Sequence, residues 1–197
     1  VDTLSAQLRA TVAARVAPGG KVDAASLEAE QFAAHGYAWF ATYAEALRQM
    51  LAWAERCQGA GKLGRLEGLM LQAVFGEYLS QMSGGIAMSQ GEIVRPDEIG
   101  LAETDMRSFR TDAVKALCRL GNTAGVRQQI AVLLREGETP ENGLGDETLL
   151  LMQEQFRRFA DEKIAPDCQE WHIRDELIPL PLVEELSALG VFGLTVP

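Results

Sequence analysis

The sequence predicts an all-α protein, because apolar residues recur every three or four positions through most of its 197 residues. Glycine and proline clusters interrupt this helical period and divide the chain into segments of helix length. No alternating run of valine, isoleucine and threonine indicates a strand. With 47% hydrophobic and 23% charged residues, the chain can bury a core and is not expected to be disordered.

Two helices are expected in the first sixty residues. The first ends before Pro18, because proline lacks a backbone donor. The second begins at Asp23, whose side chain can cap a helix, and continues to Gln58, either straight or kinked at Gly36. It carries two apolar stripes and should be covered on more than one side. The apolar residues are Leu4, Leu8, Val12 and Val16 in the first helix, and Phe40, Tyr43, Leu47, Met50, Leu51 and Ala54 with Trp39, Ala46 and Trp53 in the second.

Three further helices are expected before residue 138. One begins near Leu66 and ends at the glycine pair 84–85. Residues 86–101 show no sustained period, which predicts a long ordered loop or a functional insertion. The next two helices should form a helical hairpin, because only Gly121 and Asn122 separate them, and Asn122 should cap the second. Their apolar faces are Phe109, Ala113, Leu117 and Leu120, then Val126, Ile130, Leu133 and Leu134.

The best domain boundary is the stretch 137–145, which is rich in glycine, proline and asparagine. It predicts a helical N-terminal extension over 1–138, a linker over 139–145 and a second segment over 146–197. The second segment should contain one helix from Asp146 to Lys163 and another from Pro179 to Leu189, with Leu186 buried where the last helix meets its neighbours.

The apolar tail Val191 to Val196 is not covered by anything in its own segment, and it could extend into a strand. We therefore expect the chain to be the front part of a longer protein. The first residue, Val1, is not an initiator methionine, which suggests that the true start is also missing.

Composition argues against several partners and compartments. The net charge of -10 repels phosphate backbones and anionic lipid surfaces, so neither nucleic acid nor a membrane is an expected partner. No apolar run is long enough to span a bilayer, and the first residues do not resemble a signal peptide. The three cysteines, Cys57, Cys118 and Cys168, are odd in number and far apart, which favours small hydrophobic residues on helices in a protein of the reducing cytoplasm.

No catalytic motif is evident. His35 and His172 lie far apart in sequence and have no histidine partner at helical spacing, so a metal site is weakly supported. Phosphate-binding glycine loops and a nucleophile elbow are missing. The unusual loop is 83–96, which could contact a ligand, although an ion pair between Glu92 and Arg95 bracing a turn explains it more simply.

Residues 156–166 (FRRFADEKIAP) and 186–197 (LSALGVFGLTVP) resemble the opening of an acyl-CoA dehydrogenase. The resemblance covers about a quarter of the chain. It implies FAD-dependent α,β-dehydrogenation of an acyl-CoA substrate, with a glutamate removing the α proton, hydride passing to the flavin, and an electron-transfer flavoprotein accepting the electrons. In this family the glutamate and most flavin contacts lie beyond the matching segment. No catalytic, cofactor-binding or metal residue is therefore assigned in this chain.

Residues 30–43 (EQFAAHGYAWFATY) and the loop 84–95 resemble the N-terminal extension of one subfamily, the (2S)-methylsuccinyl-CoA dehydrogenases. This resemblance implies a cytoplasmic, homo-oligomeric enzyme of the ethylmalonyl-CoA pathway that makes mesaconyl-CoA. Two alternatives remain open: a helical interaction module without chemistry, and an acyl-CoA dehydrogenase for another short-chain substrate.

Overall fold

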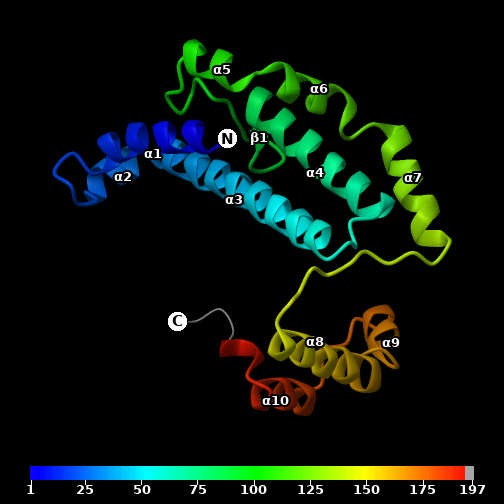
Figure 1. Ribbon diagram of the computed structural model, residues 1–197. Coiled ribbons are helices and arrows are strands. Elements are labelled where there is room, and N and C mark those ends of the chain that lie inside the picture. Colours follow the sequence, from blue (N-terminus) through cyan, green and yellow to red (C-terminus); the bar gives the residue numbers. More distant parts are fainter. Residues whose placement is uncertain (194–197) are drawn as a thin grey trace. The chain divides into compact units, whose positions relative to one another are not determined.

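The computed structural model describes residues 1–193 and divides the chain into two compact units, Val1–Gly143 and Leu144–Pro197 (Figure 1). Helices dominate both units, which confirms the predicted all-α class. The strand expected to extend towards Val196 falls partly on residues 194–197, outside the described residues, and 191–193 form a 3-10 turn.

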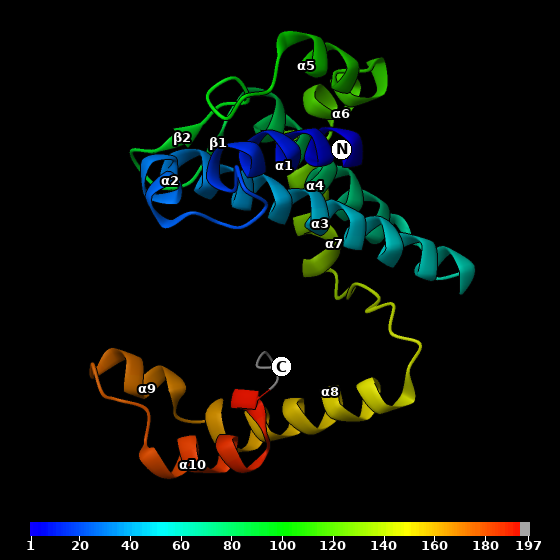
Figure 2. The same cartoon turned by 90° about the vertical axis from the view of Figure 1, so that its left-hand side faces the viewer.

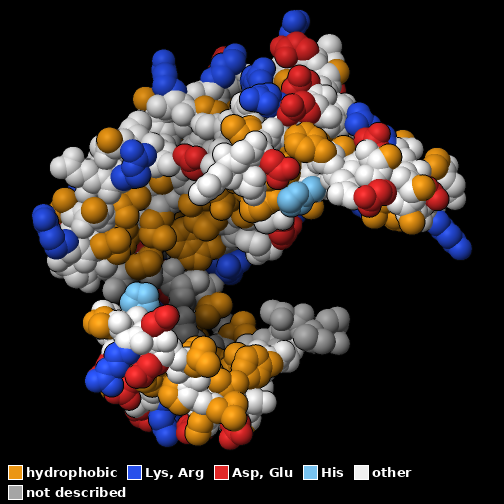
Figure 3. Space-filling model, turned by 180° about the vertical axis from the view of Figure 1, so that it is seen from behind, with side chains coloured by type: hydrophobic (Ala, Val, Ile, Leu, Met, Phe, Trp, Pro, Cys, Tyr) orange, Lys and Arg blue, Asp and Glu red, His pale blue; other side chains and the backbone are white. Residues whose placement is uncertain are grey.

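The N-terminal unit is built around two long helices, α3 (Gln31–Gly59) and α4 (Arg65–Gly84), which pack against each other. Helix α1 (Asp2–Val16) covers one side of α3 and buries the four residues predicted to face the core. Phe40 of α3 and Met82 of α4 are among the most deeply buried side chains. Seen from behind, Figure 3 shows hydrophobic side chains gathered on another side of this helix pair.

The predicted helix from Asp23 to Gln58 is in fact two helices. Asp23 caps the short helix α2 (Ala24–Ala29) by accepting a hydrogen bond of 2.7 Å from the Ser26 backbone N–H. The break falls at Glu30, and α3 continues through Gly36. A Cβ at Gly36 would lie 2.5 Å from a methyl carbon of Val94. Because Gly36 has no side chain, Val94 can pack closely against the backbone of α3 at this position.

The stretch expected to be a loop contains a small antiparallel hairpin, β1 (Ile86–Ala87) with β2 (Ile93–Val94). Ile86 pairs with Val94, and both side chains are buried in the core of the unit. The strands are too short for alternation to reveal them in the sequence. Tertiary packing against α3 and α4 holds them in place.

Three helices complete the unit: α5 (Glu103–Phe109), α6 (Asp112–Leu120) and α7 (Ala124–Arg135). Phe109, expected on the fourth helix, ends α5 instead. The predicted helical hairpin is wrong, because α6 and α7 each pack on α4 (Figure 1). Helix α7 is capped by Thr123 and not by Asn122, whose side-chain amide donates to the Glu77 carboxylate at 2.8 Å.

The C-terminal unit contains α8 (Glu147–Phe159), α9 (Cys168–Ile173) and α10 (Leu180–Ala188), and a π-helical turn over Ala160–Ile164 extends α8. Helix α10 lies beside α8 in both ribbon views (Figures 1 and 2), and Lys163 pairs with Glu185 at 3.2 Å. Helix α9 was not predicted.

The prediction that Leu186 is buried on α10 is wrong. The buried residue is Leu182, one helical turn earlier, and Leu186 is half-buried. Among residues 1–193, no helix is both long and apolar enough to cross a membrane.

Candidate functional site

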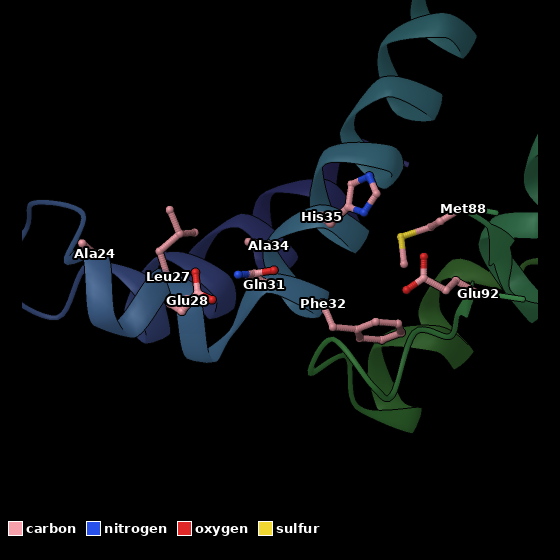
Figure 4. Close-up of a pocket in the computed structure, with 9 residues that line it drawn as sticks. All are labelled: Ala24, Leu27, Glu28, Gln31, Phe32, Ala34, His35, Met88 and Glu92. Atoms are coloured by element: carbon pink, nitrogen blue, oxygen red, sulfur yellow. The ribbon is translucent and has the colours of Figure 1, made fainter.

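A hollow of about 750 Å³ lies between α2, the first turns of α3 and the β hairpin (Figure 4). Helix α3 and the connection between β1 and β2 bring together residues that are far apart in the sequence. The lining residues are Ala24, Leu27, Glu28, Gln31, Phe32, Ala34, His35, Met88 and Glu92. The loop that the sequence singled out thus contributes to a concave site, and ligand contact there stays a prediction.

The hairpin connection is held by its own hydrogen bonds. Met88 N–H donates to the carbonyl of Glu92 at 2.8 Å, and the Ser89 hydroxyl donates to the Glu92 carboxylate at 3.3 Å. In Figure 4 the side chains of Met88 and Glu92 lie beside those of His35 and Phe32, and Leu27 and Glu28 lie at the other end of the hollow. The carboxylate of Glu92 therefore adds negative charge to a partly apolar site.

The expected ion pair between Glu92 and Arg95 is wrong. Arg95 instead pairs with Glu98, its guanidinium lying 3.6 Å from one carboxylate oxygen. The Arg95 backbone N–H donates to the other oxygen at 2.7 Å. Because Glu98 satisfies both groups of Arg95 from the far side of Pro96, the turn is braced without Glu92.

His35 is fixed by a neighbour one helical turn away. The Trp39 indole N–H donates to its Nε2 at 3.0 Å, so a neutral imidazole carries its hydrogen on Nδ1. His172 lies in the C-terminal unit, on α9. Within residues 1–193, no group of three or more histidine, cysteine, aspartate and glutamate side chains is arranged to hold a metal ion.

The cysteines show no catalytic setting. All three are free thiols; Cys57 is buried, Cys118 is half-buried and Cys168 is exposed. Burial raises the pKa of the Cys57 thiol, and the nearby carboxylates of Glu141 and Glu67 raise it further. A thiol held protonated in this way is a poor nucleophile. The hollow itself can hold an apolar group against Phe32 and Leu27, with the carboxylates of Glu28 and Glu92 favouring positive charge beside it.

Residues 139–143 cross the end of the α3–α4 pair as an extended strap that includes part of the predicted linker. The Trp53 indole N–H donates to the carbonyl of Glu141 at 2.8 Å, and Arg56 donates to the carbonyl of Gly143 at 2.9 Å. The buried carboxylate of Glu67 accepts from the backbone N–H groups of Glu141 at 2.9 Å and Gly64 at 3.0 Å. The strap is therefore anchored to the N-terminal unit.

The motif that predicts a loop at the strap, a cluster of glycine, proline and asparagine, gives no sign of this anchoring. Glu67 sits in a capping position at the start of α4, and that position in the sequence is the one signal that could have drawn attention to it. For the hollow, the sequence signal is Gly36, which interrupts an otherwise regular helical pattern. This glycine marks the place where the hairpin approaches α3.

Comparison with known proteins found one match to the C-terminal residues and another to the whole chain. Residues 146–197 match the family described as acyl-CoA dehydrogenase, N-terminal domain. The whole chain is 46% identical over 200 aligned residues to (2S)-methylsuccinyl-CoA dehydrogenase from Cereibacter sphaeroides, and it spans 36% of that relative's length. These matches confirm the resemblance inferred from the sequence. The chain is thus similar along its full length to one part of a (2S)-methylsuccinyl-CoA dehydrogenase, and its residues 146–197 are similar to the N-terminal domain of acyl-CoA dehydrogenases.

Proposed function

We propose that this chain is the front part of an FAD-dependent acyl-CoA dehydrogenase that converts (2S)-methylsuccinyl-CoA to mesaconyl-CoA. The observation that carries the proposal is the extent of the similarity. The family domain accounts for residues 146–197, whereas the 46% identity to the methylsuccinyl-CoA enzyme also covers the preceding helical unit. A relationship to the family alone would leave that unit unmatched.

The chemistry we propose removes one hydrogen from each of the α and β carbons of the acyl group, forming a double bond while FAD accepts two electrons. An electron-transfer flavoprotein would reoxidise the flavin. We further propose a cytoplasmic location and a homo-oligomeric assembly, as the subfamily resemblance implies.

The hollow beside the hairpin does not fit FAD or the phosphates of coenzyme A. The hollow beside the hairpin presents Glu28 and Glu92, and two carboxylates would repel a pyrophosphate. The sequence offers no glycine-rich phosphate loop to replace it. The groups that hold flavin and thioester therefore belong, in this proposal, to the part of the protein outside residues 1–193, and no chemical step is assigned to a residue of this chain.

The decisive experiment uses the full-length protein. Without oxygen, (2S)-methylsuccinyl-CoA should bleach the flavin absorbance, because dehydrogenation reduces FAD. The ratio kcat/KM for this substrate should exceed the ratios for butyryl-CoA and isobutyryl-CoA with one artificial electron acceptor. A preference for either competitor would keep the family and remove the substrate assignment.

A helical interaction module without chemistry is the second candidate. The half-buried aromatic side chains Trp39, Tyr43 and Tyr78 favour it, because such residues are enriched at protein interfaces. The same experiment separates the two candidates, since a preparation without bound flavin, or with flavin that no thioester reduces, would favour the module.

A further inference from the structure

The hollow beside the hairpin is lined mainly by the two sequence stretches that the proposed function leaves unused. Six of its nine lining residues belong to residues 30–43 or to the loop 84–95, and helix α2 supplies the other three. The proposed dehydrogenation assigns no step to any of them. A separate role for the hollow is therefore compatible with that reaction.

The hollow carries negative charge that no basic side chain in its lining neutralises. The lining contains Glu28 and Glu92, both exposed, and no lysine or arginine. Within residues 1–193, the Glu28 carboxylate takes part in no hydrogen bond or ion pair. One oxygen of the Glu92 carboxylate accepts from the Ser89 hydroxyl at 3.3 Å, and the other accepts no hydrogen bond from the same part of the chain. Both carboxylates are therefore available to a cationic ligand.

The two carboxylates lie at opposite ends of the hollow. In Figure 4, Glu92 lies beside Phe32 and Met88, whereas Glu28 lies with Leu27 at the other end. Phe32 and Leu27 expose 40% and 39% of their surfaces, so a ligand can contact both side chains. A ligand that matches this arrangement has a positive charge at each end and an apolar middle.

The histidine in the hollow does not provide a third acceptor for a cation. The Trp39 indole N–H occupies Nε2 of His35 at 3.0 Å, and the neutral ring carries its hydrogen on Nδ1. An ammonium group has hydrogen-bond donors only, so neither ring nitrogen can bind it. Among the charged and imidazole groups of the lining, the two carboxylates are therefore the acceptors that select the ligand.

We propose that the hollow binds a linear aliphatic diamine, with one ammonium group at Glu92 and the other at Glu28. Each ammonium group donates hydrogen bonds to a carboxylate, and the methylene chain leaves water as it contacts Leu27 and Phe32. The face of the Phe32 ring also attracts the ammonium group beside it. A ligand with a single charge leaves one carboxylate without a partner and should bind more weakly.

The test compares diamines with monoamines of the same length on the 197-residue chain. Putrescine, hexamethylenediamine and octamethylenediamine are titrated at low ionic strength against butylamine, hexylamine and octylamine. Binding is followed by the assigned NMR signal of the Met88 methyl group, which lies in the lining. One diamine of the series should bind about fivefold more tightly than its monoamine, which is the gain that one exposed ion pair provides.

Two variants test whether both carboxylates are used. Glu28→Gln and Glu92→Gln should each lower the affinity for the diamine to that for the monoamine, because each removes one negative charge. Glutamine keeps an oxygen that can accept from Ser89, so the second variant should retain the hairpin connection. The matched control is Glu55→Gln, at an exposed position of α3 outside the hollow. It makes the same change in net charge and should leave the affinity unchanged.

Equal affinities for diamine and monoamine at every length would overturn the proposal, because they would show that the two carboxylates do not act together. A loss with Glu55→Gln as large as that with Glu28→Gln would also overturn it, since the diamine would then respond to the overall charge of the protein. A Met88 signal that no diamine shifts would exclude the hollow as the site. The titrations need neither flavin nor thioester, so their result is independent of the flavin-reduction test of the proposed function.

Discussion

The two units of this chain differ in how fully each covers its own hydrophobic residues. The N-terminal unit has a core in which Leu8, Phe40 and Ile99 are almost completely buried. In the described part of the C-terminal unit, Leu182 is the one buried hydrophobic side chain. Leu151 of α8 and Ile173 of α9 expose 71% and 72% of their surfaces. A helix whose apolar stripe stays exposed needs a neighbour to cover it.

This difference shows that the N-terminal unit buries a hydrophobic core and that the described part of the C-terminal unit buries much less hydrophobic surface. The N-terminal unit encloses a core of its own, in which side chains of several helices and the hairpin are buried. The described helices of the C-terminal unit bury little of their hydrophobic surface within that unit. We therefore expect substitutions in the first unit to cost stability in the 197-residue chain, and substitutions in the second to show their full cost only in the full-length protein.

The largest expected effect is the loss of Phe40, which exposes 1% of its surface. Phe40→Ala should lower the free energy of unfolding by about 3–5 kcal/mol, because it removes a ring and leaves a cavity. The control Leu180→Ala, at a C-terminal position with 67% exposure, should change it by less than about 0.5 kcal/mol. Urea denaturation of the 197-residue chain measures both, and similar losses would contradict the comparison.

A substitution on α10 tests whether the C-terminal unit is completed elsewhere. Leu186→Asp should cost about 1 kcal/mol in the 197-residue chain, where Leu186 is half-buried, and about 3 kcal/mol in the full-length protein, where we expect cover. Thermal melts of both proteins, with exposed Glu184→Ala as the control, measure the difference. Equal costs in the two proteins would show that this face of α10 remains open.

The strap gives an intermediate effect in the N-terminal unit. Glu67→Ala should destabilise the chain by about 2 kcal/mol, because the backbone N–H groups of Gly64 and Glu141 both lose a charged acceptor. The fluorescence of Trp53 should shift to longer wavelength as the strap loosens. Glu55→Ala, at an exposed position of α3, is the control and should leave both readings unchanged.

The local periodicity of the sequence predicts most of the helices but not the break between α2 and α3 or the shortest elements. The four-residue spacing of Leu4, Leu8, Val12 and Val16 predicted α1 and its buried face. The break at Glu30 was missed, because the residues on both sides of it have helical character and the cap at Asp23 serves only the short helix. The hairpin and α9 were missed because each is too short to show a period.

The candidate site was less predictable than the fold because it depends on tertiary contacts. The sequence singled out the loop containing Met88 and Glu92 but could not show that α3 brings His35 and Phe32 to the same hollow. The partner choice of Arg95 also followed from the turn geometry at Pro96, which places Glu98 within reach. Likewise, nothing in the spacing indicated that Asn122 would pair with Glu77 in place of capping α7.

The smallest expected effect is a pH dependence confined to the junction of α4 and α7. Hydrogen bonds from Gln81 at 2.7 Å and Asn122 at 2.8 Å lower the pKa of the Glu77 carboxyl below its ordinary value of 4.5. A carboxyl whose pKa is lower in the folded state adds stability that is complete above the unfolded value and is lost as the pH falls through the folded value. The stability gap between the parent and Glu77→Gln should therefore be constant well above pH 4.5 and should shrink as the pH falls below 4.5. Urea denaturation across this range measures the gap in the N-terminal unit. A gap that stays constant down to the lowest pH would show that these two hydrogen bonds do not favour the ionised carboxylate over the protonated acid.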